Sequence, residues 1–268
     1  MPNLRPPLNN LEGNMNSLIK QEQAGVWILG MNRPDKHNAL DTSLTLALLE
    51  TLREARESAR CRAIVLHGIG PSFCAGADTS EFKGFEEGRE RAAHRAAQTT
   101  ALHEVFNLLP QPVVAAVHGN ALGGGAGLAL ACDLLVAAET TRFGYPELRH
   151  GICPAIVMGN LTRQLGRKQA FELVSTGRIL SGGELHAWGL ANQVVLHPDA
   201  CLQAAMALAE RWAEFSAPAM AATKRLFYRC ADATLAEALQ CGLDTNIMMR
   251  SFSREQGVNT RSSGDASS

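Results

Sequence analysis

The sequence predicts an α/β fold built around a mainly parallel β-sheet that helices cover on both faces. Through the first half of the chain, short strand-like segments that are almost wholly apolar alternate with longer segments of helical periodicity. Strands without polar alternation are typical of parallel sheets buried on both sides. After Pro154 the pattern becomes almost purely helical. The 268 residues suffice for one large core, and we expect a single domain over residues 17–255, with a core over about 17–200 and a helical lobe over about 201–255.

The first predicted elements are a hairpin and a capped helix. Two strand-like segments, Leu18–Glu22 and Val26–Met31, are separated by Ala24-Gly25, which suits a tight turn. Asp41 is a favourable N-cap for a helix that continues to about Ser58. The apolar residues of this helix recur at helical spacing and form one face: Leu44, Leu48, Leu49, Leu52 and Ala55.

The following elements continue the alternation. We expect strands at Ala63–Leu66, Val113–Val117 and Leu134–Ala138, and helices at Arg89–Leu109 and Ala126–Ala131. Beyond Pro154 we expect one strand, at Gln193–Leu196, and helices at about Ala155–Leu165, Arg167–Thr176, Ser181–Trp188, Asp199–Phe215, Pro218–Arg229 and Leu235–Ser251. The two ends, residues 1–16 and 256–268, are polar and weakly periodic, and we expect them to be flexible tails.

Composition argues against several classes of function. The formal net charge is −1 and the pI about 6.7, so there is no electrostatic basis for nucleic acid or an anionic membrane as a partner. No apolar run is long enough to cross a membrane. The seven cysteines are widely spaced and lack the spacing of metal ligands; reduced core thiols are the better interpretation, which favours a cytoplasmic location and no metal site. The glycine patterns of P-loops and dinucleotide-binding folds are not matched.

Two glycine-rich loops each follow a buried strand. They are Gly68–Asp78 (GIGPSFCAGAD) and Gly119–Leu128 (GNALGGGAGL). Glycines let a backbone approach another group closely, and the N–H groups at a helix start suit an anionic oxygen. One interpretation is an oxyanion site with one donor from each loop; the other is a helix packed tightly on a sheet with nothing bound. A carboxylate, Glu147, follows in the segment Phe143–Glu147, where a solvated loop residue is the alternative.

Five motifs follow one another between about Leu18 and Leu226. They are NRPDKHNAL (32–40), FCAGAD (73–78), GNALGGGAGL (119–128), Cys-Asp (132–133) and FGYPELRHG (143–151). In this order they resemble the crotonase, or enoyl-CoA hydratase/isomerase, superfamily. The resemblance implies a spiral of ββα turns with a helical C-terminal trimerisation lobe, in a homotrimer or hexamer. It also implies an acyl-CoA thioester as substrate, with no covalently bound cofactor.

The resemblance further assigns residues to the site. It implies that the backbone N–H groups of Ala77 and Gly124 form the oxyanion hole and that Glu147 is the acid/base. It places five residues along the CoA pocket: Lys36, Ala39, Ala75, Asp78 and Thr79. Lys224, on the helix after Pro218, is implied to reach the CoA phosphate of a neighbouring subunit. For Lys36 and Lys224 the alternative is a solvated surface lysine.

The chain departs from the pattern of typical hydratases at one catalytic position. Those hydratases carry two glutamates, and the first falls on Gly127 here, while the second is Glu147. A single carboxylate favours a proton shift between the α and γ carbons over addition of water, which needs two proton transfers. An acid used by related thioester hydrolases is replaced by Ala155, which disfavours hydrolysis. The Pro154-Ala155 pair, however, is similar to branches that hydrate or dehydrate with one glutamate.

We therefore expect an enoyl-CoA hydratase/isomerase-type reaction through a thioester enolate, with hydration or dehydration first. The alternatives are a double-bond isomerase, a dehydratase acting on an acyl carrier protein, and a non-catalytic acyl-CoA-binding homologue. The histidines are scattered along the chain, and for His118 and His150 a structural role is the favoured interpretation. Nearby groups that could supplement Glu147 are Tyr145, Arg149, His150 and Cys153.

Overall fold

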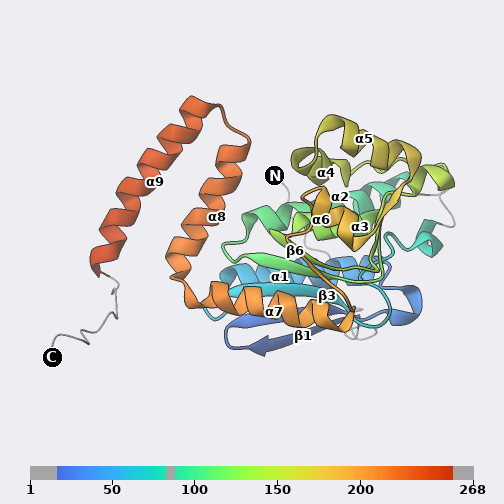
Figure 1. Ribbon diagram of the computed structural model, residues 1–268, viewed down its shortest axis with the longest axis horizontal. Coiled ribbons are helices and arrows are strands. Elements are labelled where there is room, and N and C mark those ends of the chain that lie inside the picture. Colours follow the sequence, from blue (N-terminus) through green and yellow to red (C-terminus); the bar gives the residue numbers. More distant parts are fainter. Residues whose placement is uncertain (1–16, 83–87, 256–268) are drawn as a thin grey trace.

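The computed structural model describes residues 17–82 and 88–255, so both predicted tails lie outside the described residues. Its main sheet has six strands in the order β1-β2-β3-β4-β6-β9 (Figure 1). Strands β1 and β2 form the predicted antiparallel hairpin, and the remaining pairs are parallel. The strands are β1 Leu18–Gln23, β2 Val26–Met31, β3 Ala63–Gly68, β4 Val113–Val117, β6 Leu134–Ala138 and β9 Gln193–Val195.

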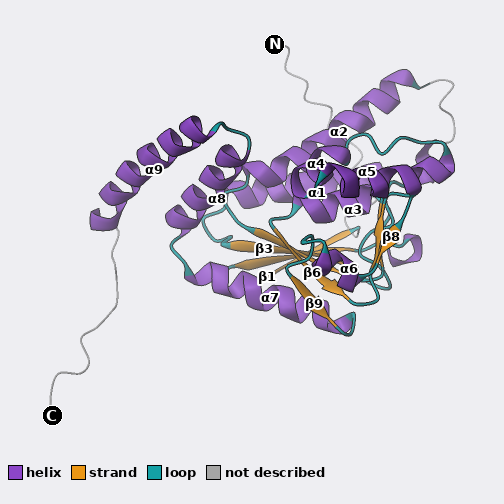
Figure 2. Ribbon diagram, turned by 45° about the horizontal axis from the view of Figure 1, so that its top comes forward, coloured by secondary structure: helices purple, strands orange, loops and turns teal. Residues whose placement is uncertain are grey.

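Both faces of this sheet are covered, as the apolar strands predicted. Alternate residues of β3 point to opposite sides: Ile64 and Leu66 join a core with helices α1, α2 and α3, whereas Val65 packs against α7. Figure 2 shows α7 beneath the sheet and α1, α2 and α3 above it. The helices are α1 Thr42–Glu57, α2 Arg89–Leu108, α3 Gly124–Ala131 and α7 Asp199–Glu214.

Helix α1 confirms the predicted cap and face. The Asp41 side chain accepts a hydrogen bond from the Leu44 amide at 2.7 Å, and all five predicted face residues are buried. Helix α3 begins two residues before the predicted Ala126, at Gly124. This earlier start puts the glycine triplet itself at the helix N-terminus, where amides lack intrahelical acceptors.

A second, small sheet was not predicted from the sequence. It contains β5 Asn120–Leu122, β7 Arg142–Gly144 and β8 Ile179–Leu180. Strands of two or three residues are too short to show a period of their own. Their effect is to fix the chain just before the 3₁₀ helix Glu147–His150, which follows β7. Two further 3₁₀ helices are Pro34–Lys36 and Thr79–Phe82.

The C-terminal half is helical, as predicted, apart from β8 and β9. Its remaining helices are α4 Met158–Gln164, α5 Arg167–Thr176, α6 Gly182–Ala187, α8 Ala217–Ala231 and α9 Leu235–Glu255. Helix α4 starts three residues later than predicted, because residues 155–157 form a turn. No described helix has both the length and the apolar character that a membrane crossing requires.

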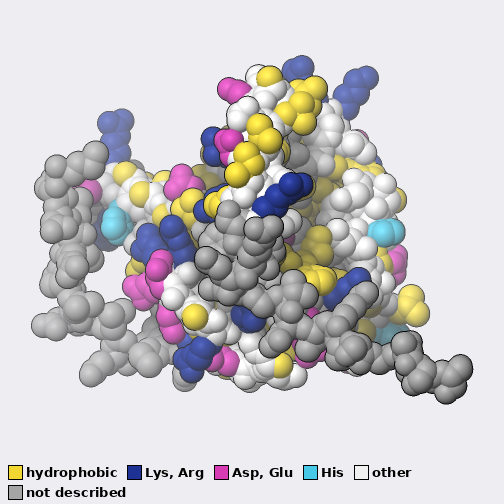
Figure 3. All heavy atoms as spheres, turned by 90° about the vertical axis from the view of Figure 1, so that its left-hand side faces the viewer, with side chains coloured by type: hydrophobic (Ala, Val, Ile, Leu, Met, Phe, Trp, Pro, Cys, Tyr) yellow, Lys and Arg dark blue, Asp and Glu magenta, His cyan; other side chains and the backbone are white. Residues whose placement is uncertain are grey.

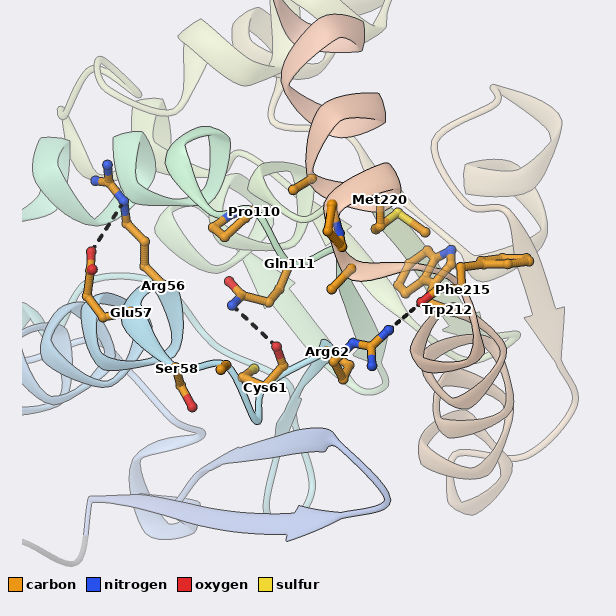
Figure 4. Close-up of a pocket in the computed structure, with 14 residues that line it drawn as sticks. Arg56, Glu57, Ser58, Cys61, Arg62, Pro110, Gln111, Trp212, Phe215 and Met220 are labelled. Atoms are coloured by element: carbon orange, nitrogen blue, oxygen red, sulfur yellow. Dashed lines mark hydrogen bonds and ion pairs between the residues drawn. The ribbon is translucent and has the colours of Figure 1, made fainter. Parts of the chain in front are cut away.

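Helices α8 and α9 form an arm that projects from the body (Figures 1 and 2). The arm is anchored at Asp133, which binds Lys224 Nζ at 2.7 Å and the Tyr228 hydroxyl at 2.7 Å. Figure 4 shows the joint where α7 turns into α8: a cavity of about 330 Å³ borders Trp212, and the Arg62 guanidinium donates to the Phe215 carbonyl.

Candidate active site

The two glycine-rich loops lie side by side in the structure. The Cys74 amide donates to the Asn120 carbonyl at 2.9 Å, and the Leu122 amide donates to the Cys74 carbonyl at 3.0 Å. A Cβ at Gly125 would lie 2.1 Å from the Cys74 carbonyl oxygen, so a larger residue there would separate the loops. The glycine triplet therefore brings the start of helix α3 against the loop at residues 74–77.

This contact brings together the two backbone amides proposed for the oxyanion hole. A Cβ built on Gly124 would lie 3.6 Å from the Ala77 nitrogen. Gly124 is the first residue of α3, and its N–H belongs to the unpaired first turn. Within residues 17–82 and 88–255, neither amide donates to a protein acceptor. Two neighbouring N–H groups are thus available to one oxygen atom.

A cavity of about 350 Å³ lies in front of these amides. Its lining is mostly apolar, which suits a hydrocarbon chain with few polar anchors. Helix α2 contributes residues at helical spacing: Ala92, Arg95, Ala96 and Thr99. The opposite wall follows the chain from Pro146 and Glu147 through His150 to Val157.

Glu147 enters this cavity beside the glycine triplet. Gly123 has φ +51°, and a Cβ there would lie 2.8 Å from Glu147 Oε1, so the glycine lets the carboxylate approach the start of α3. The carboxylate is half-buried, and its Oε2 has no hydrogen-bond partner within the described part of the chain. Burial raises the pKa of Glu147, while a backbone contact and the charge of His150 act against this rise. A carboxyl group in this setting can both accept and return a proton.

The position of the absent first glutamate is filled. A Cβ at Gly127 would lie 2.4 Å from Val157 Cγ1 and 3.0 Å from His103 Cε1. Val157 is 5% exposed and His103 is 8% exposed, so this side of α3 is closely packed. Among the described residues, the His103 ring has one hydrogen-bond partner, Asn160 Nδ2 at 3.2 Å from Nδ1, and burial lowers the pKa of His103 to about 4. The histidine is therefore neutral at physiological pH.

The structure brings some of the predicted CoA-pocket residues to the cavity and leaves others beside it. Ala75 and Thr79 line the cavity. Lys36 is exposed and Ala39 half-buried, on a segment that runs alongside residues 75–78. Asp78 is not a lining residue: it binds Ser80 Oγ at 2.6 Å and Arg33 Nη2 at 2.9 Å, contacts that lower its pKa to about 2.

The structure shows where Lys224 lies within one chain. Its ammonium is 2.7 Å from Asp133 Oδ2 and 2.9 Å from the Gln111 carbonyl oxygen, and the residue is 6% exposed. Lys224 is not among the residues that line the cavity of its own chain. It anchors the α8–α9 arm, and its contact with the CoA phosphate of a neighbouring subunit stays a prediction.

Sequence reasoning expected cavity-lining positions between Glu81 and His103, but it did not single out the residues of helix α2 that form them. Its cavity residues, Ala92, Arg95, Ala96 and Thr99, recur at i, i+3, i+4 and i+7. That spacing is visible in the sequence, but small and polar residues at such positions are equally typical of a helix face exposed to solvent. The packing of Val157 on Gly127 had no sequence signal, because these residues are far apart along the chain.

Two neighbouring amides and one half-buried carboxylate thus face the same mostly apolar cavity. The fold around this cavity is that of the crotonase class. Residues 21–260 match the family model described as Enoyl-CoA hydratase/isomerase, and the chain belongs to this family.

Individual relatives align with this chain over most of their length. A protein of Rhizobium meliloti named "Probable enoyl-CoA hydratase" is 38% identical over 229 residues, which cover 84% of this chain and 86% of that protein. A protein of Bacillus subtilis with the same name is 35% identical over 80% of this chain and 83% of its own. The crystal structure of an enoyl-CoA hydratase from Mycobacterium smegmatis superimposes with a TM-score of 0.83 at 33% identity, covering 87% of this chain and 90% of that one. The predicted fold and enzyme class are thereby confirmed.

Proposed function

We propose that this enzyme adds water to the double bond of an enoyl-CoA, or removes water from the corresponding 3-hydroxyacyl-CoA. The thioester oxygen accepts hydrogen bonds from the Ala77 and Gly124 amides, so negative charge on the enolate is stabilised where it forms. Glu147 takes and returns the proton. The observation that carries this proposal is the Glu147 carboxylate, which lies against Gly123 with Oε2 unpartnered within the described residues and next to the two free amides.

The experiment is hydration of crotonyl-CoA by wild-type enzyme and by Glu147→Gln. Glutamine keeps the shape of the side chain, but its amide cannot act as a general acid or base. We therefore expect kcat to fall by about 10²–10⁴ while substrate still binds. Glu104→Gln, an exposed carboxylate on α2, is the control and should retain full activity. Unchanged turnover in Glu147→Gln would contradict the proposed role, and a wild type that binds acyl-CoA without turnover would favour the non-catalytic alternative.

Isomerisation of a 3-enoyl-CoA is the second candidate reaction. It is favoured by the single carboxylate, because Val157 fills the space beside Gly127 where a second one would stand. A proton shift from the α to the γ carbon needs one base on one face of the substrate. Growth of the conjugated-enoyl absorbance from a 3-enoyl-CoA, faster than hydration of the 2-enoyl isomer, would make isomerisation the main activity.

For the carrier, we propose that CoA lies along the paired segments 36–40 and 75–78. These segments are joined by hydrogen bonds from the Ala75 amide to the His37 carbonyl (2.9 Å) and from the Leu40 amide to the Gly76 carbonyl (2.7 Å). Lys36 offers an exposed ammonium at this edge for a phosphate group. The pantetheine arm of an acyl carrier protein would use the same edge, and comparing crotonyl-CoA with a crotonyl carrier protein distinguishes the two.

We further propose that the α8–α9 arm mediates a homotrimer or hexamer in the cytoplasm. Leu235, Leu239, Leu243 and Ile247 recur every four residues along α9 and are each more than half exposed, at 76, 66, 53 and 60%. Figure 3 looks onto this arm and shows hydrophobic side chains along it. An apolar stripe of this kind favours contact with another chain. All seven cysteines are unpaired thiols, which is consistent with a reducing compartment.

A further inference from the structure

A second titratable side chain shares a cavity wall with Glu147. His150 ends the 3₁₀ helix that Glu147 begins. Such a helix has three residues per turn, so the side chains of residues i and i+3 lie over one another. Both residues line the cavity in front of the oxyanion amides. An imidazole and a carboxylate therefore face the same substrate space.

The charged groups around His150 leave its ring available. The other titratable residues that line the cavity are Glu147, Cys153 and Arg95. Arg95, across the cavity on α2, is ion-paired with Glu81 and donates to the Leu40 carbonyl at 2.6 Å. Arg149 turns away and donates to the Gly177 carbonyl at 3.0 Å, at the end of α5.

Helix α5 packs on the same 3₁₀ helix, and its Glu172 is engaged by Arg178 at 2.6 Å. No described residue forms a hydrogen bond with the His150 ring. The charge of His150 also acts on Glu147 and lowers its pKa against the effect of burial, so the two groups interact electrostatically. The imidazole is exposed and can exchange its proton with water.

Two other titratable groups close to the site, Tyr145 and His103, do not line the cavity. Tyr145 is fully buried, does not line the cavity, and burial raises the pKa of its hydroxyl. His103 lies behind Val157. An imidazole has two ring nitrogens, so it can donate a proton and accept one.

We propose that His150 is the second catalytic acid/base residue of this site, working with Glu147 in the hydration reaction proposed above, on which this inference rests. Glu147 starts as carboxylate and His150 as imidazolium. Water gives a proton to Glu147 as its oxygen bonds to the β-carbon, and the electron pair of the double bond moves to form the enolate. The imidazolium then gives its proton to the α-carbon as the thioester reforms. Transfer of the proton from Glu147 to His150 restores both groups, so the net change is addition of one water; dehydration runs the same steps in reverse.

The test compares wild type with His150→Gln in crotonyl-CoA hydration across pH. The reaction needs both a proton acceptor and a proton donor, so wild-type kcat should fall on both the acid and the alkaline side. We expect His150→Gln to lower kcat by about 10²–10³ with KM within about threefold, and to lose the alkaline limb while keeping the acid one. His94→Gln is the control, since His94 is exposed on α2 and does not line the cavity.

The outcomes separate this inference from the function on which it rests. An active wild type with His150→Gln within threefold of its kcat and an unchanged pH profile would overturn the role of His150 alone. A wild type that neither hydrates crotonyl-CoA nor dehydrates its product would overturn the proposed function and the role of His150 together. Recovery of His150→Ala activity by added imidazole would support a proton-transfer role over a structural one.

Discussion

Two glycines one turn apart at the start of helix α3 have opposite surroundings. Gly123 leaves room for the Glu147 carboxylate, whose Oε2 lacks a partner among the described residues. One turn later, Gly127 is covered by Val157 and His103. The first glycine lies against a charged side chain, and the second lies against closely packed buried side chains.

This difference shows that glycine at position 127 removes a catalytic side chain and also makes room for Val157. Because Val157 packs within van der Waals contact of the Gly127 backbone, a glutamate could not be restored there without moving a buried residue. The proton chemistry is therefore confined to the wall formed by residues 147–150. Substitutions beside Gly127 and changes of pH test this difference between the polar and the apolar part of the wall.

The largest effect is expected for Gly127→Glu. The new Cβ would overlap Val157 Cγ1 at 2.4 Å and the carboxylate would be buried against a neutral histidine, so we expect a loss of more than about 4 kcal/mol in the free energy of unfolding. Urea unfolding measures it. Gly159→Glu is the matched control, because nothing lies within 4 Å of a Cβ there, and it should cost little.

The double variant Gly127→Glu with Val157→Gly tests the cause. Removing the valine side chain opens the space that the glutamate needs, so part of the lost stability should return. If the double variant is no more stable than Gly127→Glu alone, overlap with Val157 is not the reason for the loss.

A smaller effect is expected in the pH dependence of stability, and its sign is opposite for His103 and Glu147. Burial lowers the pKa of His103 from 6.5 to about 4, so the unfolded chain binds more protons between these values and stability falls as pH drops through them. The contribution reaches about 3 kcal/mol at pH 4. Glu147 acts oppositely, since its raised pKa disfavours the folded state at neutral pH and this cost disappears below its ordinary value of 4.5.

Unfolding curves of wild type and His103→Gln between pH 7 and pH 4 measure the first contribution. The variant should lose less stability over this range than wild type, while His94→Gln, an exposed histidine, should follow wild type. Equal slopes in all three proteins would mean that His103 titrates normally and that the apolar wall admits water.

The sequence predicted the main sheet and the two glycine-rich loops well because their signals are local. Apolar strands, the Asp41 cap and the glycine triplet each report on their own neighbourhood, and the ordered motifs identify the family. The small sheet, the earlier start of α3 and the place of Lys224 depend on contacts between distant segments. From its own helix alone, Lys224 is equally well interpreted as a surface lysine, and the contact with Asp133 is seen only in the folded structure.

The same limit applies to the catalytic wall. The sequence showed that Glu147 stands alone and that His150 is near it, but scattered histidines favoured a structural interpretation. The 3₁₀ geometry of residues 147–150 turns both side chains to the cavity, and a three-residue period over one turn leaves no pattern to detect.

The smallest effect is expected for Val157→Ala, which thins the apolar wall without adding charge. Two methyl groups leave a surface that lines the cavity and covers Gly127, so the pocket deepens toward His103. We expect kcat/KM to shift by about tenfold toward enoyl-CoA substrates longer by one or two carbons, since one methylene changes selectivity by roughly this factor. Val105→Ala, a buried position on α2 that does not line the cavity, controls for loss of stability and should leave the chain-length profile unchanged. A uniform loss of kcat/KM for every chain length in Val157→Ala would show that the wall supports the fold without limiting the acyl chain.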